Sequence, residues 1–216
     1  MNQLPTVAPR PYRMHNQIQH YAWGTRDEDA FIAHLVGMEP EPGVPYAELW
    51  MGAHPKAPST IELDDGETVS LDAWIAAYPR EILGPEIAER FGNLPFLFKV
   101  LSAGQSLSIQ AHPTKAQAEV LHKRDPEHYP DDNHKPEIAV ALDRLTALLG
   151  FKPPEDLVAA LQDYPEMAAF VAADIVDQLK DAVGGDDERI LDKASQRWAR
   201  EKTRQLFASL IERARR

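Results

Sequence analysis

Three polar side chains alternate with apolar ones between Leu107 and His112. Residues two positions apart on a strand point to the same face, so Ser108, Gln110 and His112 would share one face. That face would present a hydroxyl, an amide oxygen and an imidazole nitrogen. The same alternation also fits an ordinary half-exposed strand, and the spacing alone does not decide between the two.

A second polar group, Asp132–Glu137, stands directly before the apolar run Ile138–Leu142. At the start of a strand, Lys135 and Glu137 would point the same way. If the two strand starts face one another, two oxygens and one nitrogen become available to a divalent ion. That set is Gln110, His112 and Glu137. Zinc accepts imidazole and carboxylate ligands readily and amides less often, so the residue types alone leave the metal open.

A lysine interrupts the apolar run Pro95–Leu101. Burying Lys99 without a partner would be costly, which predicts that it faces an acid, a phosphate or a water-filled pocket. An edge strand with Lys99 in solvent explains the residue equally well. The run Tyr46–His54 is another predicted strand, and residues of these types are often surface or packing residues. One of its faces carries Glu48, Trp50 and His54.

The composition narrows the class of function. The chain has 216 residues, 44% of them hydrophobic, which is enough to bury a core. Its formal net charge of -11 makes nucleic acid and membrane surfaces unsuitable partners. Without cysteine, a metal must be held by His, carboxylate, amide or water ligands. No apolar run has the length of a signal peptide or membrane span, so we expect a cytoplasmic protein.

The elements that would position these residues change in character near residue 150. Short apolar runs separated by turn residues come first, and they predict strands in a sandwich or barrel. The predicted strands are Ala47–Ala53, Ser59–Leu63, Pro95–Leu101, Leu107–His112 and Glu137–Leu142. We therefore expect a mixed, mainly β fold, with a β-rich domain over 1–153 and a helical domain over 154–216.

Helix signals interrupt the β-rich part. Ser70 can cap a helix, and Glu86–Phe91 ends at Gly92, a suitable residue for a helix C-terminus. Thr114–Gln117 has the pattern of a capping box, which predicts a helix directly after His112. Beyond Pro154 the apolar residues follow helical spacing, which predicts a mostly helical domain.

Four blocks in this order resemble the type I phosphomannose isomerase family. The blocks are His20–Gly24, Ala47–Pro55, Leu94–Thr114 and Asn133–Glu137. The resemblance implies a cupin-like jelly-roll β-sandwich for the strand-rich part, and it makes the helical remainder similar to the helical domain that follows the catalytic cupin in that family.

The resemblance also implies an activity, the interconversion of mannose 6-phosphate and fructose 6-phosphate through a cis-enediol. It carries the family's Zn2+ ligands onto Gln110, His112 and Glu137. For proton transfer between C1 and C2 we expect His134 and Lys135, since an imidazole and a desolvated lysine can titrate near neutrality. The residues expected to bind substrate are Trp23, Glu48, Lys99 and Ser108; Trp23 is as easily a core residue.

One family feature has no match here. Family members carry a fourth ligand, a histidine, and a catalytic arginine in β structure after the helical domain, and nothing after Glu137 matches either. We therefore expect the N-terminal part of an isomerase or a short relative. The alternative is a non-catalytic metal- or sugar-phosphate-binding cupin. The expected partner is a hexose 6-phosphate, with self-association or a completing chain as a further hypothesis.

Overall fold

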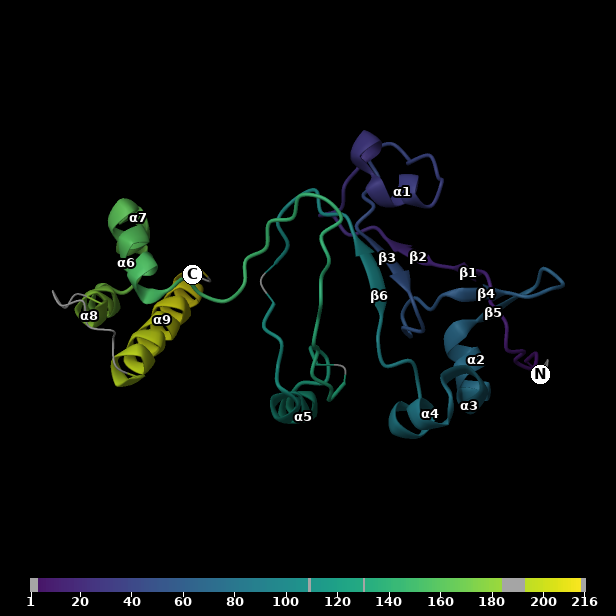
Figure 1. Ribbon diagram of the computed structural model, residues 1–216. Helices are drawn as coiled ribbons and strands as arrows, with labels where there is room; N and C mark the ends of the chain where they lie inside the picture. Colours follow the sequence, from purple (N-terminus) through teal and green to yellow (C-terminus); the bar gives the residue numbers. More distant parts are fainter. Residues whose placement is uncertain (1–3, 109, 130, 184–192, 215–216) are drawn as a thin grey trace. The chain divides into compact units, whose positions relative to one another are not determined.

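The computed structural model describes residues 4–108, 110–129, 131–183 and 193–214 (Figure 1). The chain divides into two compact units, Met1–Pro136 and Glu137–Arg216. Each is described by itself. The domain boundary expected between residues 153 and 154 stays a prediction.

Two small antiparallel sheets form the centre of the first unit. One has the order β1-β4-β5 and the other the order β2-β3-β6. The strands of the first sheet are Met14–His15, Thr60–Glu62 and Thr68–Ser70. Those of the second are Gln17–Gln19, Glu48–Met51 and Phe98–Leu101. In the second sheet β3 lies between β2 and β6, with Trp50 opposite Lys99.

Each sheet packs one face against a helix. The short helices η1 (Asp27–Asp29) and α1 (Phe31–Leu35) follow β2. Ile32 of α1 and Leu49 of β3 lie in one buried apolar cluster, so α1 covers that face of the second sheet. In the first sheet Ile61 and Val69 pack with Trp74 of α2. Because side chains alternate along a strand, β3 leaves Glu48 and Trp50 on the face opposite Leu49.

Gly24 marks a close approach between two backbone segments. A Cβ atom at this position would lie 2.7 Å from the Ala47 nitrogen. Thr25 forms a bridge with Tyr46, and its hydroxyl lies 2.6 Å from that of Ser102. The segment around Trp23 is therefore held against the start of β3, where only glycine fits.

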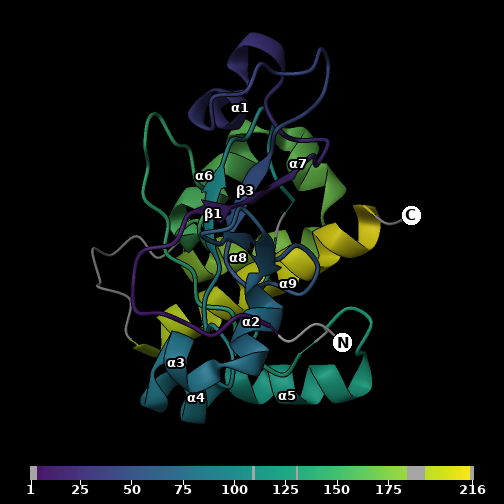
Figure 2. The ribbon, with the colours of Figure 1, turned by 90° about the vertical axis from the view of Figure 1, so that its right-hand side faces the viewer.

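Helices follow strands β5 and β6 of the first unit. α2, α3 and α4 pack in sequence after β5 (Figure 2), and α5 begins at a complete capping box between Thr114 and Gln117. Their bounds are Leu71–Ala77, Pro79–Leu83, Pro85–Phe91 and Lys115–Arg124. The predicted end of α4 at Gly92 is confirmed, since Gly92 adopts the left-handed conformation.

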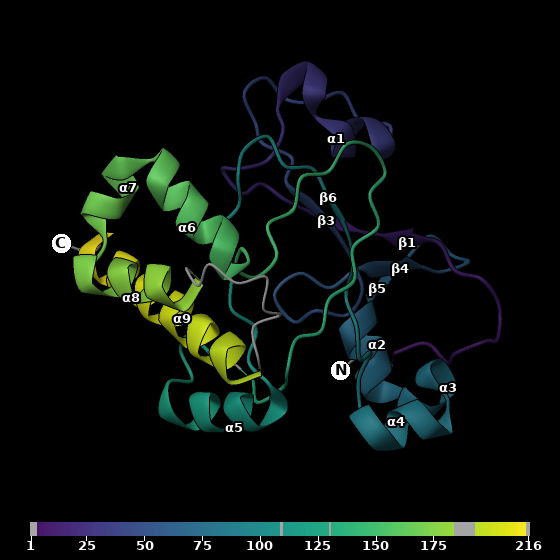
Figure 3. The ribbon, with the colours of Figure 1, turned by 60° about the vertical axis from the view of Figure 1, so that its left-hand side comes forward.

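The second unit is helical, as the spacing beyond Pro154 predicts. Its helices are α6 (Pro154–Asp163), α7 (Pro165–Phe170), α8 (Ala173–Val183) and α9 (Lys193–Ala214). α8 and α9 lie side by side (Figure 3) and pack apolar side chains with α6. Leu161, Leu179 and Leu206 are buried there.

The expectation of a mainly β fold is wrong. Helices hold far more of the described residues than strands do. None of the described residues of Leu107–His112 or Glu137–Leu142 lies in a strand. Ile138 and Val140 are 93% and 80% exposed. The alternation of these runs is real, but a strand also needs a neighbouring strand to complete its hydrogen bonds.

In the described parts of the chain, no helix is both long enough and apolar enough to cross a membrane.

Candidate functional site

A buried polar group occupies the outer face of β3 and β6. Register places Trp50 directly opposite Lys99 and Glu48 opposite Leu101. Since Glu48 and Trp50 are two positions apart, they share a face with Lys99. The two charged side chains are largely buried, since those of Lys99 and Glu48 are 27% and 10% exposed. The prediction that Lys99 faces an acid is confirmed; β6 lies at the edge of the described sheet, and Lys99 keeps part of its surface in solvent.

One carboxylate oxygen receives two donors in this group. Lys99 Nζ lies 3.0 Å from Glu48 Oε2, and the indole N–H of Trp50 donates to the same oxygen. The Lys99 ammonium also lies 4.6 Å from the centre of the Trp50 ring, over its face. Trp50 therefore contacts both charged partners, as a hydrogen-bond donor to Glu48 and as a cation–π surface for Lys99.

His54 extends this group beyond the end of β3. Its ring centre lies 4.7 Å from that of Trp50 in an edge-on contact. Burial lowers the pKa of His54, and the positive charges of Lys56, Lys99 and Lys135 lower it further, while Asp131 raises it. Lys99 and Lys135, which the sequence predicts to bind substrate and to transfer a proton, both contribute to this lowering.

Two aromatic residues, Tyr21 and Trp23, precede Gly24 in the segment that lies against the start of β3. Trp23 is half-buried, and its ring stacks on that of Tyr21 with centres 5.9 Å apart. Burial, and secondly the negative charge of Glu48, raise the pKa of Tyr21. The carbonyl oxygen of Trp23 accepts a hydrogen bond from the amide of Gly104, 2.9 Å away. Trp23 is thereby tied to the chain that leads to Ser108.

The three polar residues of the first motif lie outside helices and strands. Ser108, Gln110 and His112 are all exposed. His112 is followed by Pro113 and then by the capped start of α5. The capping box fixes the start of α5 at Lys115. His112 therefore lies only a few residues before a rigid helix. Ile109 lies outside the described residues.

The residues of the second motif lie at the border of the two units. His134 and Lys135 belong to the first unit and are exposed, while Glu137 is the first residue of the second unit. Within the described ranges, no group of three His, Asp or Glu side chains is close enough to bind a metal ion. Gln110, His112 and Glu137 as a ligand set therefore stay a prediction.

The chemistry of this donor set suits zinc. An imidazole nitrogen, a carboxylate and a neutral amide are all ligands that the ion accepts, and three protein ligands are usual for catalytic sites that keep a position open. The chain has no cysteine to compete for the ion. Gln110 and His112 are also exposed, so binding an ion would not require them to leave a packed core.

Two residues of this site were not predicted as functional. Tyr21 stands in the block His20–Gly24, but only the folded chain places it near Glu48. Trp50 was grouped with Glu48 on one predicted face, without a role. The alternation along β3 would have identified Trp50, whereas no local signal identifies Tyr21, because its neighbour comes from a distant part of the chain.

Comparisons with known proteins identify the family to which the chain is similar. The family model described as "Phosphomannose isomerase type I, catalytic domain" matches residues 12–154. Mannose-6-phosphate isomerase from Mus musculus is 44% identical over 188 residues, covering 84% of this chain and 44% of that protein. The Homo sapiens protein of the same name is 41% identical over 190 residues, with 85% and 45% covered.

A solved structure is similar as well. It is mannose 6-phosphate isomerase from Salmonella typhimurium, described as bound to its substrate, fructose 6-phosphate, and a zinc atom. The TM-score is 0.74 at 36% sequence identity, over 93% of this chain and 47% of that one. The chain spans less than half the length of the curated relatives it matches. On the extent of the family match and the identity to these relatives, the chain belongs to the type I phosphomannose isomerase family.

Proposed function

We propose that this protein acts as a zinc-dependent aldose–ketose isomerase that interconverts mannose 6-phosphate and fructose 6-phosphate through a cis-enediol. One observation carries the proposal: the family match over residues 12–154 includes every candidate site residue from Trp23 to Glu137. The similar Salmonella protein is described as bound to fructose 6-phosphate and zinc. The buried Lys99–Glu48 pair supports the proposal from the geometry.

The proposed metal ligands are Gln110, His112 and Glu137. Bound zinc supplies positive charge that stabilises the negative oxygen developing as a proton leaves the carbon beside a carbonyl. Gln110 stays neutral at every pH, so this set contributes a single negative charge and leaves the ion electrophilic. The finer fold proposed for the first unit is the cupin-like jelly roll of the family.

The proposed substrate contacts come from the buried polar group and its surroundings. Lys99 is held near Glu48 and retains enough exposure for its ammonium to reach an anionic or hydroxyl group of a sugar phosphate. Ser108 offers a hydroxyl to the same ligand, and Trp23 offers an apolar wall beside Tyr21. Glu48 keeps the ammonium of Lys99 in place and accepts hydrogen bonds from sugar hydroxyls.

The proton moves between C1 and C2 of the sugar, which requires a group that takes it from one carbon and returns it to the other. We assign this step to His134 and Lys135. Lys135 lies close enough to His54 for its charge to lower the pKa of that imidazole. The proposed location is the cytoplasm, because a charged sugar phosphate does not cross membranes unaided and the enzyme must meet it where it is made.

Two measurements on the purified chain test the proposal. Zinc content by inductively coupled plasma spectrometry compares the unchanged chain with Gln110→Ala, His112→Ala and the control His128→Ala, an exposed histidine paired with Asp125. We expect bound zinc in the unchanged chain and the control, and little in the other two. A coupled assay then follows fructose 6-phosphate formation with chelator and after zinc is restored.

The two measurements separate the alternatives. Turnover that chelator abolishes and zinc restores supports the isomerase. Zinc binding that depends on Gln110 and His112, without turnover, would instead indicate a non-catalytic metal-binding cupin. A chain that binds no zinc would count against the proposal as a whole.

A further inference from the structure

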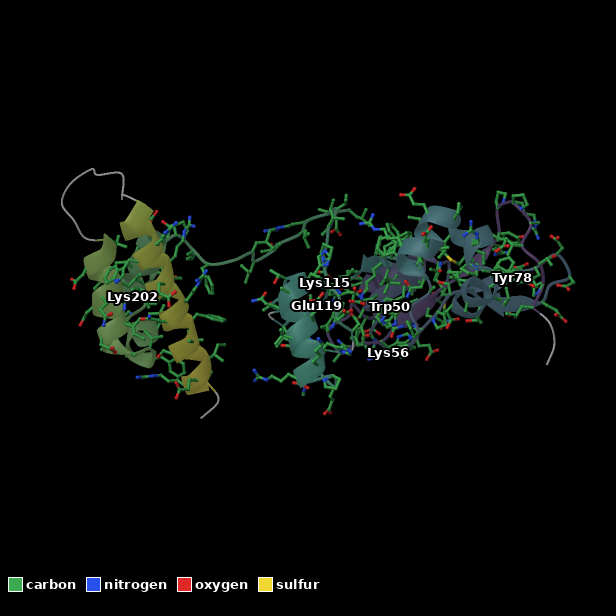
Figure 4. All side chains as sticks on the ribbon, turned by 90° about the horizontal axis from the view of Figure 1, so that it is seen from below. Trp50, Lys56, Tyr78, Lys115, Glu119 and Lys202 are labelled. Atoms are coloured by element: carbon green, nitrogen blue, oxygen red, sulfur yellow. The ribbon has the colours of Figure 1, made fainter. Side chains whose placement is uncertain are left out.

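Lys115 joins the start of α5 to a segment that follows the helix. Its ammonium donates to the main-chain oxygen of Asp132 at 2.9 Å and lies 3.0 Å from Asp132 Oδ2. Glu119, one helical turn further, lies 3.6 Å from the same nitrogen. Figure 4 shows Lys115 and Glu119 next to each other on α5. One lysine therefore binds both the backbone and the side chain of Asp132.

A second contact holds the same segment against α5. Nδ1 of His122 lies 2.6 Å from the main-chain oxygen of Tyr129. Lys115, Glu119 and His122 are spaced by four and three positions, so they share one face of the helix. The amide of Tyr129 also donates to the carbonyl of Asp125, which turns the chain back after the helix. Tyr129 and Asp132 of the returning chain thus contact this face at His122 and Lys115.

The contact between Lys115 and Asp132 lies close in the sequence to the candidate site residues. Lys115 stands three residues after His112, and Asp132 stands two residues before His134. The contact therefore brings to one end of α5 the segment that carries Gln110 and His112 and the segment that carries His134 and Lys135. The capping box at Thr114 fixes the helix end at which they meet.

The contact is not one that the fold needs for its stability. Both side chains are about half exposed, and exposed ion pairs contribute little to the free energy of unfolding. The hydrogen bond to Asp132 nevertheless raises the pKa of Lys115, and the hydrogen bond from Lys115 lowers the pKa of Asp132, so both stay charged over a wide pH range.

We propose that Lys115 and Asp132 form a clasp whose role is to hold the ligand segment Gln110–His112 next to His134–Pro136, the chain that leads to the proposed zinc ligand Glu137. The proposal rests on the proposed function for its metal, but the clasp itself is a property of the metal-free chain. Residues that orient metal ligands without touching the ion commonly change metal affinity by about 10- to 100-fold when they are replaced.

The first experiment needs no metal. Hydrogen–deuterium exchange is measured on the chain with Lys115→Met and on the control Lys123→Met, which changes an exposed lysine of the same helix. The amide of Asn133 donates to Asp131 Oδ1, beside the clasp, so we expect its exchange to rise about 10-fold in Lys115→Met, with the amides of Ala118–Arg124 unchanged. Unchanged exchange at Asn133 would overturn the clasp.

The second experiment measures zinc affinity by competition with a chelating dye. We expect Lys115→Met to weaken binding by about 10- to 100-fold, Asp132→Asn to weaken it less because the main-chain acceptor remains, and Lys115→Arg to restore it. Lys123→Met should bind as the unchanged chain does. Faster exchange with unchanged zinc affinity would overturn the positioning role.

The two failures are distinguishable. If the unchanged chain binds no zinc, the proposed function loses its metal and the positioning role fails with it, while the exchange data still decide whether the clasp exists. If the unchanged chain binds zinc but Lys115→Met does so equally well, the proposed function stands and the positioning role is wrong.

Discussion

Lys99 Nζ lies 3.0 Å from Glu48 Oε2, although 51 positions separate the two residues in the chain. Neighbouring strands β3 and β6 bring them together on the outer face of their sheet. Trp50, directly opposite Lys99, contacts both. A cation, an acid and an aromatic ring thus form one buried unit, whose members should depend on one another energetically.

Removing the cation should destabilise the first unit. Lys99→Met leaves Glu48 as a nearly buried carboxylate with one donor lost, so we expect the free energy of unfolding to fall by about 1–3 kcal/mol. Urea denaturation measures this change. Lys123→Met, on the exposed surface of α5, should leave the urea midpoint unchanged. Equal effects of the two substitutions would show that the Lys99–Glu48 pair contributes nothing specific.

Trp50 should be coupled to Lys99. Trp50→Leu removes the donor to Glu48 and the ring beneath the ammonium, so a double-mutant cycle with Lys99→Met should give a coupling energy of about 1 kcal/mol. Trp74→Leu is the matched control, because Trp74 is buried in the other apolar cluster of this unit. Its cycle with Lys99→Met should be additive; additivity at Trp50 as well would contradict the contact.

Gly24 should not tolerate a side chain. In Gly24→Ala the new Cβ would lie 2.7 Å from the backbone of Ala47, so the start of β3 must shift, at a cost of about 1–3 kcal/mol. Thermal unfolding followed by circular dichroism measures the loss. In Gly37→Ala the Cβ meets no atom and only the left-handed backbone is strained, which costs about 1 kcal/mol. A smaller loss at Gly24 than at Gly37 would refute the close packing.

His54 should make stability depend on pH. Its pKa in the folded chain is lowered from the ordinary value of 6.5, so the unfolded chain takes up the proton first as the pH falls. The free energy of unfolding should therefore decrease below about pH 6.5, down to the lowered pKa, with no contribution from His54 above that range.

Urea denaturation at several pH values between about 5 and 8 measures this dependence. His54→Gln, which cannot titrate, should lose part of the slope below about pH 6.5. An unchanged slope in His54→Gln would mean that the surrounding cations do not act on this imidazole.

The sequence predicts helices correctly where their ends depend on neighbouring residues. The capping box at Thr114 and the glycine end at Gly92 depend on neighbours within a few residues, and both are confirmed. The strands β3, β4 and β6 lie within their predicted runs. The helices beyond Pro154 also follow from spacing, because an amphipathic helix completes its backbone hydrogen bonds within itself.

Strand prediction failed where a partner was needed. Alternation along Leu107–His112 indicates which side chains would share a face, but it does not show that another strand lies alongside. The proximity of Tyr21 to Glu48 has the same origin, since it depends on the fold bringing β3 beside the segment before Gly24. For Lys99 the sequence predicts only that a buried lysine has a partner, because burying an unpaired cation is costly. It does not identify that partner as Glu48.

The clasp changes how an ion would find its ligands. It joins residues 17 positions apart and so closes a chain loop. The conformational entropy lost in closing this loop is lost before any ion binds. Donors on either side of the closed loop search a smaller volume than donors on an open chain, so each meets the ion at a higher effective concentration. In the terms of coordination chemistry, Lys115 and Asp132 turn separate side chains into a preorganised chelate.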